Sequence, residues 1–498
     1  MKRLENLAMI AHDMGLIFEF LGMVSLVPFL VLLAFHEWDM LIPMASVPVV
    51  FFLFGYIISH IPSSEVEPSF SFTLTAVALS WFAIALIGAL PFMIGLHMSY
   101  TDAIFEAMSG WTGTGFTMLN SVDTAPKTLL FWRTFMQWIG GIGIIAFGIS
   151  LRRKTRVSLF RLYKAEGREE ELVPPTVSTS RRMWMIYLVL TFGFTGLVML
   201  LGIPLWDSLN LVMVAIATGG FSIHSLGLAY YNNPFLEALL VPIMLAGAIP
   251  FKVFFFLYEG RVSSMVKDHT VHNLLLLVLA GSVITSFDLF STLGYSPLTA
   301  IREGVFMSAA AVATCGLQNA SPETWTAVPI AVIAMLMFIG GAMGSTSGGI
   351  KVNRVELAFH GVRWWFRRFF VSSRVIVPLR YGGKTLQKEI SDLAISKNML
   401  VIVIYALTIF VATIAMMHLY ITAFRPEQVI FELVSALSNS GLTVGLITAA
   451  SPFTVKWIFI VLMWLGRLEI VPVIIVGMGI VKGIRDDINA DRDIPQQI

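Results

Sequence analysis

The most informative part of this sequence is one ten-residue string, Met108-Ser109-Gly110-Trp111-Thr112-Gly113-Thr114-Gly115-Phe116-Thr117. Three similar strings follow it: Ile216-Ala217-Thr218-Gly219-Gly220-Phe221-Ser222, Val312-Ala313-Thr314-Cys315-Gly316-Leu317 and Leu437-Ser438-Asn439-Ser440-Gly441-Leu442-Thr443. Each contains small or hydroxyl-bearing residues, then a glycine, and then Phe or Leu. The glycines at positions 115, 220, 316 and 441 are 105, 96 and 125 residues apart, which indicates four internal repeats.

Each string ends a short apolar segment that lies between two longer apolar runs. Runs of about twenty residues are long enough to cross a hydrocarbon core about 30 Å thick. They are Gly15–Phe35, Ile42–His60, Thr73–Leu96, Trp184–Leu205, Leu274–Leu293, Met399–Tyr420 and Trp457–Ile480. Only 13% of the residues are charged, about half the share found in soluble domains. In lipid, a long apolar run forms all its backbone hydrogen bonds internally when it is a helix. The sequence therefore predicts an all-α polytopic membrane protein.

The basic residues predict how the chain is threaded. Of 33 lysines and arginines, 27 fall in five clusters: the N-terminus, Arg152–Arg182, Lys252–Lys267, Lys351–Lys397 and Lys482–Arg492. Basic residues in short loops mark the cytoplasmic side, so both termini are predicted to be cytoplasmic. No signal-peptide cleavage site is evident, and the first helix is expected to be retained. Each stretch of chain between two clusters must cross the membrane to the outer side and return to the cytoplasmic side. Its short middle run fits a re-entrant segment.

The predicted organisation is an N-terminal helix pair followed by four tandem helix–pore loop–helix repeats around a central pore. The boundaries are 1–65 for the pair, 66–165 for repeat 1 with pore loop 101–118, 166–268 for repeat 2 with pore loop 206–222, 269–390 for repeat 3 with pore loop 300–318 and gating loop 340–350, and 391–498 for repeat 4 with pore loop 427–443.

The chemistry of such a unit suits a cation. A short helix that stops inside the membrane points its partly negative C-terminal end at the centre. Extended backbone at that depth is tolerated where it lines a water-filled path, and its carbonyls can replace the hydration shell of an ion. Acidic residues lie thirteen or nine positions before the glycines, and we expect them near the outer ends of the short helices: Asp102, Asp207, Glu303, Glu106 and Glu432.

One such string alone is better explained by close helix packing. Four strings, each at the same position within its repeat, favour a pore. The four strings, the run Gly340–Lys351 and the string Gly466-Arg467-Leu468-Glu469 resemble the Trk/Ktr/HKT superfamily, most closely its TrkH-like branch, over nearly the whole chain. The resemblance implies a potassium filter, with K+ as the transported ion and no covalent cofactor. The filter residues it implies are Thr112, Gly113, Thr114, Gly115, Thr218, Gly219, Gly220, Thr314, Cys315, Gly316, Asn439, Ser440 and Gly441.

A glycine-rich loop (residues 340–350) interrupts the second long run of the third repeat. Glycine costs about 1 kcal/mol relative to alanine inside a helix, so this run predicts a break, either a packing kink or a mobile gate. The resemblance implies a gate formed by Gly340, Gly341, Gly344, Ser345, Thr346, Ser347, Gly348 and Gly349. Arg467, inside the last apolar run, pairs with Glu469 or another carboxylate, reaches an interface, or faces the pore as a barrier to cations. The resemblance implies the last.

Three classes of function fit a repeated membrane protein: a cation channel, an alternating-access transporter, and a membrane enzyme. The enzyme is disfavoured because no paired carboxylates, histidine cluster or nucleophile motif lies at membrane depth, and Cys315 is the only cysteine. The transporter is disfavoured because its repeats are usually inverted. The sequence does not distinguish coupling to protons or sodium from passive flow.

The chain has no nucleotide-binding motif of its own. The resemblance therefore implies a homodimer with a cytosolic TrkA-like (RCK/KTN) nucleotide-binding subunit on the loops Arg152–Arg182 and Lys351–Lys397, in the plasma membrane of a prokaryote. The tract Arg363–Lys388 mixes basic and aromatic residues, and beside a membrane it is expected to meet lipid and not nucleic acid.

Overall fold

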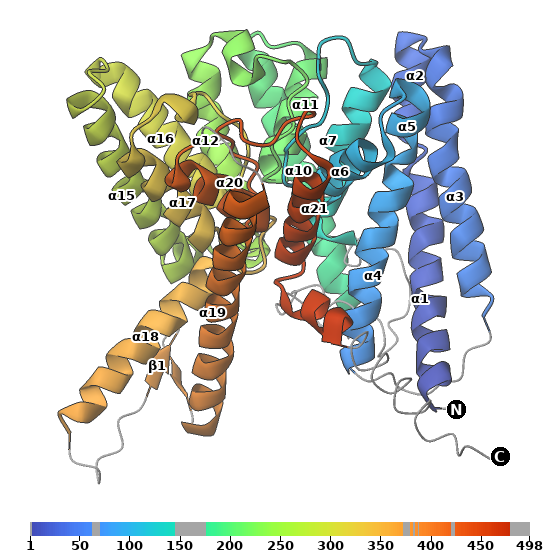
Figure 1. Ribbon diagram of the computed structural model, residues 1–498. Helices are drawn as coiled ribbons and strands as arrows, with labels where there is room; N and C mark the ends of the chain where they lie inside the picture. The colour runs from blue at the N-terminus through green and yellow to red at the C-terminus, as the bar shows by residue number, and fades with distance from the viewer. Residues whose placement is uncertain are drawn as a thin grey trace.

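The computed structural model describes residues 2–61, 70–144, 176–371, 379–381, 384–386, 388–419 and 424–478. In these ranges the regular structure is helical except for one antiparallel hairpin, in which β1 (Leu379–Tyr381) pairs with β2 (Lys384–Leu386). The all-α prediction is confirmed apart from this hairpin, which lies beside α18 at the lower edge of Figure 1. Of the basic clusters, most of Arg152–Arg182 and all of Lys482–Arg492 lie outside the described residues.

An N-terminal helix pair flanks the bundle, drawn in dark blue in Figure 1. α1 (Lys2–Val24) bends into α2 (Pro28–Phe35), and α3 (Leu41–Ser59) returns beside them. Gly15 and Gly55 let α1 and α3 approach closely, because a Cβ on Gly15 would lie 2.5 Å from Ser59 N and 2.8 Å from Gly55 O. Small residues at such crossings allow the backbone-to-backbone packing common in membranes.

Four units of similar construction follow, each with a membrane-spanning helix, a helix that leads into one of the glycine strings, and a last helix. In chain order they are α4 (Phe70–Gly88) with α5 (Leu90–Leu96), α6 (Tyr100–Thr112) and α7 (Lys127–Ile142); α10 (Thr176–Leu200), α11 (Leu205–Ile216) and α12 (Pro234–Ala248); α15 (His269–Ser291), α16 (Pro297–Ala313) and α17 (Ala327–Ile339); and α19 (Lys388–Leu419), α20 (Pro426–Leu437) and α21 (Phe453–Arg467). By length and composition, six helices in the described residues can span a membrane, or up to eight if two bent pairs are counted.

The last helix of the second, third and fourth units is followed by a break and a further helix. α12 meets α13 (Phe251–Tyr258) at 99°, just before α14 (Val262–Val266), and α21 meets the helix Val471–Met478 at 116°. α17 and α18 (Val352–Phe369) are separated by the glycine-rich loop, and α7 ends at Gly143, which has φ 95°. The predicted break in the third unit is confirmed, whereas the prediction of one continuous span over Trp457–Ile480 is wrong.

Local chemistry explains the unexpected breaks. Pro250 cannot donate a backbone hydrogen bond and disfavours helix at the residue before it, which separates α12 from α13. Glu469 and Ile470 both have positive φ, 56° and 68°, so α21 cannot continue past them. Neither site contains the glycine cluster that announces a break in a sequence.

Candidate functional site

The short helices α6, α11, α16 and α20, here called the pore helices, end in the same way in all four units. One residue adopts left-handed φ at each end: Gly113 at 75°, Thr218 at 51°, Thr314 at 51° and Asn439 at 53°. Its N–H donates to the carbonyl three residues back, and the next N–H donates to the carbonyl five residues back: Thr114 to Ser109, Gly219 to Val214, Cys315 to Ala310 and Ser440 to Ser435, at 2.8–2.9 Å. This is a Schellman motif repeated four times.

After each motif comes one of the four repeated glycines, and these glycines meet in chain order. A Cβ on Gly115 would lie 2.6 Å from Gly220 Cα, and one on Gly220 would lie 2.6 Å from Gly316 Cα. A Cβ on Gly316 would lie 2.7 Å from the carbonyl oxygen of Ser440, and one on Gly441 would lie 3.2 Å from Gly115 Cα, which closes the circle. Backbone surrounds every one of these positions, so no side chain fits without displacing a neighbouring loop.

Polar side chains hold the first two loops. Gly115 N–H donates to Ser109 Oγ at 3.0 Å, and the Gln137 side-chain oxygen accepts from the N–H groups of Gly220 and Phe221, both at 3.2 Å. Thr112 and Thr114 share a hydrogen bond of 2.8 Å between their hydroxyls. The filter residues expected from the sequence are therefore brought together, and Gln137 is a support for them that sequence reasoning did not identify as such.

Two buried carboxylates hold the chain as it leaves the circle of glycines. Glu106 accepts from Met118 N–H at 2.7 Å and from the Thr117 hydroxyl at 3.0 Å, and its Oε1 lies 2.6 Å from Arg133 Nε. Arg133 also donates to the carbonyl oxygen of Ser222 at 2.9 Å, so it joins the first two loops.

Glu432 repeats this arrangement in the fourth unit. It accepts from the Thr443 hydroxyl at 2.6 Å and from Val444 N–H at 2.8 Å. The expectation that all five acidic residues lie at the outer helix ends is wrong for these two carboxylates and for Glu303, which lies in the middle of α16. It is correct for Asp102 and Asp207, which lie in the first turns of α6 and α11.

The glycine-rich loop lies against the inner ends of three pore helices. The Thr346 hydroxyl is 2.9 Å from the carbonyl oxygen of Ile216, Gly348 N–H donates to Thr314 Oγ1 at 2.6 Å, and Gly349 N–H donates to the Ser438 carbonyl at 3.2 Å. The last carbonyls of a helix lack partners within it, and the loop binds two of them. Ser345, Thr346 and Ser347 are buried.

A polar cavity of about 40 Å³ lies between this loop and the break after α21. Its lining includes Lys351, Asn439, Arg467 and Glu469, and its volume is about that of one water molecule. Arg467 donates to the carbonyl oxygens of Gly140 and Gly141, the latter at 3.2 Å. Its guanidinium also lies over the Trp81 ring, 5.0 Å from the centroid.

Glu469, one partner considered for Arg467, forms an ion pair with Arg354 of α18. The Lys351 ammonium group donates to the Ser347 carbonyl within the loop. Arg354 was not singled out in the sequence, because nothing there shows that α18 begins next to the break after α21.

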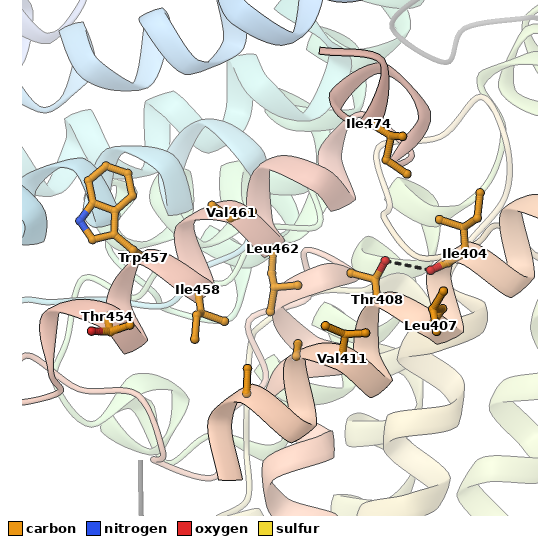
Figure 2. Close-up of a pocket in the computed structure, with 12 residues that line it drawn as sticks. Ile404, Leu407, Thr408, Val411, Thr454, Trp457, Ile458, Val461, Leu462 and Ile474 are labelled. Carbon is orange, nitrogen blue, oxygen red and sulfur yellow. Dashed lines mark hydrogen bonds between the residues drawn. The ribbon is translucent and has the colours of Figure 1, made fainter. Parts of the chain in front are cut away.

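A second hollow lies away from these groups, between α19 and α21 (Figure 2). It has a volume of about 690 Å³ and is lined mainly by Ile, Leu, Val and Ala side chains. One of its few hydroxyls, that of Thr408, already donates to the Ile404 carbonyl at 2.8 Å. Because a dehydrated cation needs oxygen ligands, this pocket is not part of an ion path.

Comparison with known proteins agrees with this architecture. A family model described as "TrkH: Cation transport protein" matches residues 49–480. A cation transporter of Methanocaldococcus jannaschii is 29% identical over 469 residues, which cover 94% of each chain. The Trk system potassium uptake protein TrkH of Halomonas elongata is 28% identical over 484 residues, 94% of this chain and 98% of its own.

A solved structure is similar along almost the whole chain. The crystal structure of the potassium transporter TrkH from Vibrio parahaemolyticus superposes with a TM-score of 0.79 at 26% identity, and covers 94% of this chain and 98% of its own. The family model spans most of the sequence, including all four pore loops and the glycine-rich loop. This chain therefore belongs to the TrkH family of cation transport proteins.

Proposed function

We propose that this chain forms a potassium-selective pore that admits K+ through a ring of backbone carbonyls from its four pore loops. The observation that carries the proposal is the closed circle of Gly115, Gly220, Gly316 and Gly441, where no side chain fits. Relatives named as potassium uptake proteins support the choice of ion.

The geometry gives a physical reason for passage of a cation. Carbonyl oxygens of extended backbone can replace the water around K+, and the C-terminal ends of four pore helices add partial negative charge near the centre. The buried carboxylates Glu106 and Glu432 hold the outgoing backbone through hydrogen bonds. A filter held in this way is preorganised for an ion of one size.

The proposal includes a gate. The glycine-rich loop lies across the inner ends of three pore helices, and Arg467 lines the cavity next to it. Movement of the loop would open the path, and the positive charge of Arg467 would raise the energy of a cation there.

The remaining expectations also form part of the proposal. The chain acts as a homodimer in the plasma membrane of a prokaryote, with both termini cytoplasmic. A cytosolic TrkA-like subunit docks on the basic loops, of which only parts, such as Arg182 and Arg368, are in the described residues. Retention of that subunit after neutralisation of these loops would place the docking surface elsewhere.

Flux of K+, Rb+ and Na+ into vesicles that contain the purified chain and the regulatory subunit tests the pore. Wild type should pass K+ and Rb+ in preference to Na+, and Gly115→Ser and Gly316→Ser should lower that preference by tenfold or more. Gly193→Ser and Gly196→Ser are matched controls, because a Cβ at either position meets nothing within 4 Å. Absence of flux, or equal selectivity in the filter variants, would favour an alternating-access transporter.

A further inference from the structure

The outward face of α18 carries an exposed aromatic stripe. Phe359, Val362, Phe366 and Phe369 recur every three or four residues, which places them on one face of the helix. Their side chains are 67%, 40%, 55% and 65% exposed. Trp365 packs edge-on against Phe369 at 4.4 Å between ring centroids, so the aromatic groups form an ordered cluster.

The opposite face of α18 is the one that packs on the protein. Leu357 and Gly361 are buried there. A Cβ on Gly361 would lie 3.0 Å from the Ile395 side chain of α19, which shows how closely the two helices approach. The aromatic stripe therefore takes no part in the contact with α19.

Two arginines lie along one edge of the stripe. Arg363 and Arg367 are exposed and four residues apart, so their side chains are neighbours on the helix surface. The ion pairs formed among the described residues do not include either of them. Arg368 is on the other side, where its guanidinium lies 5.1 Å from the centre of the Trp364 ring.

The position of α18 brings this face to a membrane surface. The helix starts at the glycine-rich loop beneath the pore helices and extends for 18 residues, about 27 Å at 1.5 Å per residue. Half of a hydrocarbon core is about 15 Å. Figure 1 shows α18 inclined away from the bundle towards the lower edge. In the membrane orientation of the proposed function, the second half of this inclined helix, with Phe366, Phe369 and the two arginines, lies where the acyl chains meet the headgroups.

We propose that this face of α18 binds anionic phospholipid, with the stripe at the boundary of the acyl chains and Arg363 and Arg367 on the phosphate. The inference rests on the membrane orientation in the proposed function, which puts this end of α18 at the cytoplasmic leaflet. That leaflet carries negative lipids, and arginine forms paired hydrogen bonds with phosphate. The same helix continues from the glycine-rich loop, so the bound lipid anchors the element that carries the gate.

Native mass spectrometry of the full chain in detergent tests this inference without measuring ion flux. The chain is mixed with equal amounts of phosphatidylglycerol and phosphatidylcholine, and the lipids it retains are counted. Wild type should retain phosphatidylglycerol preferentially, and Arg363→Gln/Arg367→Gln should reduce that preference at least threefold. Arg363→Lys/Arg367→Lys should keep most of it, and so should Arg261→Gln/Lys267→Gln, which removes two exposed charges elsewhere. Added inorganic phosphate should not displace the lipid.

Other results would overturn the inference. Equal retention of the two lipids by wild type, or an unchanged preference in the Arg363→Gln/Arg367→Gln variant, would show that α18 does not select anionic lipid. If Phe366→Ser changed the oligomeric state but left lipid retention unchanged, the stripe would be an interface between two copies of the chain. A chain that selects phosphatidylglycerol but passes no K+ would leave this inference standing and refute the proposed pore.

Discussion

One residue at the end of each pore helix has a left-handed backbone, and only the first unit places glycine there. Thr218 and Thr314 are β-branched, and such residues are rare at positive φ, which costs on the order of 1–3 kcal/mol. Their side chains offset this cost through contacts: Thr218 lies 3.3 Å from the Thr346 hydroxyl, and Thr314 accepts from Gly348 N–H. The strained residues therefore connect the filter to the glycine-rich loop.

Replacement of the buried carboxylates Glu106 and Glu432 is predicted to lower the stability of the fold by different amounts. Glu106→Gln leaves Arg133 buried without its ionic partner, which costs about 3–5 kcal/mol. Glu432→Gln keeps one acceptor oxygen and leaves no paired cation behind among the described residues, so the cost should be about 1 kcal/mol. Thermal unfolding in detergent measures both, and equal losses of stability would refute this distinction.

Arg467 is predicted to slow the passage of cations. A unit charge about 8 Å from an ion, at an effective dielectric constant of about 20, changes the energy of the ion by about 2 kcal/mol. Arg467→Ala should raise K+ flux more than tenfold, whereas Arg467→Lys should remain close to wild type. Flux in the alanine variant no faster than wild type would show that Arg467 serves only to bind the carbonyls of Gly140 and Gly141.

Filter glycines were predictable because a local string recurs. Their supports were not predictable, because these contacts join distant parts of the chain. Arg133 binds the carbonyl of Ser222, 89 residues away, and Gln137 binds the loop at Gly220, 83 residues away. The carboxylates were assigned by analogy with helix N-termini, whereas Glu106 and Glu432 lie further along and reach the outgoing backbone.

Among the elements, the glycine-rich loop is held by many hydrogen bonds, including Ala342 N–H to the Ala248 carbonyl and Thr346 N–H to the Gly247 carbonyl, both at 3.0 Å. Its break was predictable from five glycines in ten residues. The breaks after α12 and α21 were not, because they depend on Pro250 and on the conformation of Glu469 and Ile470, which apolar runs conceal.

Removal of one bond to this loop should favour its open position. Thr314→Val keeps the shape of the side chain but removes the acceptor for Gly348 N–H, and a hydrogen bond is worth about 1 kcal/mol, or about fivefold in an equilibrium. K+ flux should rise by about that factor. Thr285→Val is the control, because the hydroxyl of this buried threonine has no partner in the described structure. A similar rise in both variants would contradict the role of the bond.

In the whole molecule, polar contacts join each unit to the next around the pore. They are Arg133 to Ser222, Arg302 to Glu237 at 2.8 Å, Arg425 to Trp325 at 2.7 Å, and Lys456 to Asp102 at 2.5 Å. The last contact closes the circle between the fourth unit and the first. Repetition predicted four units, but the order of these partners required the fold.

The ion pair Lys456–Asp102 is predicted to tolerate exchange of its two charges better than reversal of one charge alone. Asp102→Lys or Lys456→Asp alone places like charges together at a mostly buried site and should cost about 3–5 kcal/mol. The double exchange should recover most of this loss in thermal unfolding. The exposed pair Arg261–Glu259 is the control, since exchange there should change stability by less than about 1 kcal/mol. Additive losses in the double variant would show that the pair does not close the bundle.

The circle of four glycines also has a genetic consequence. A channel assembled from four identical subunits receives any mutation in its filter four times. Here each quarter of the ring has its own codons, so a mutation alters one wall and leaves three unchanged. Ion preference can therefore change in small steps during evolution. The residues beside the glycines already differ between loops, with Cys315 in one and Asn439 in another. Four identical subunits could not carry such differences.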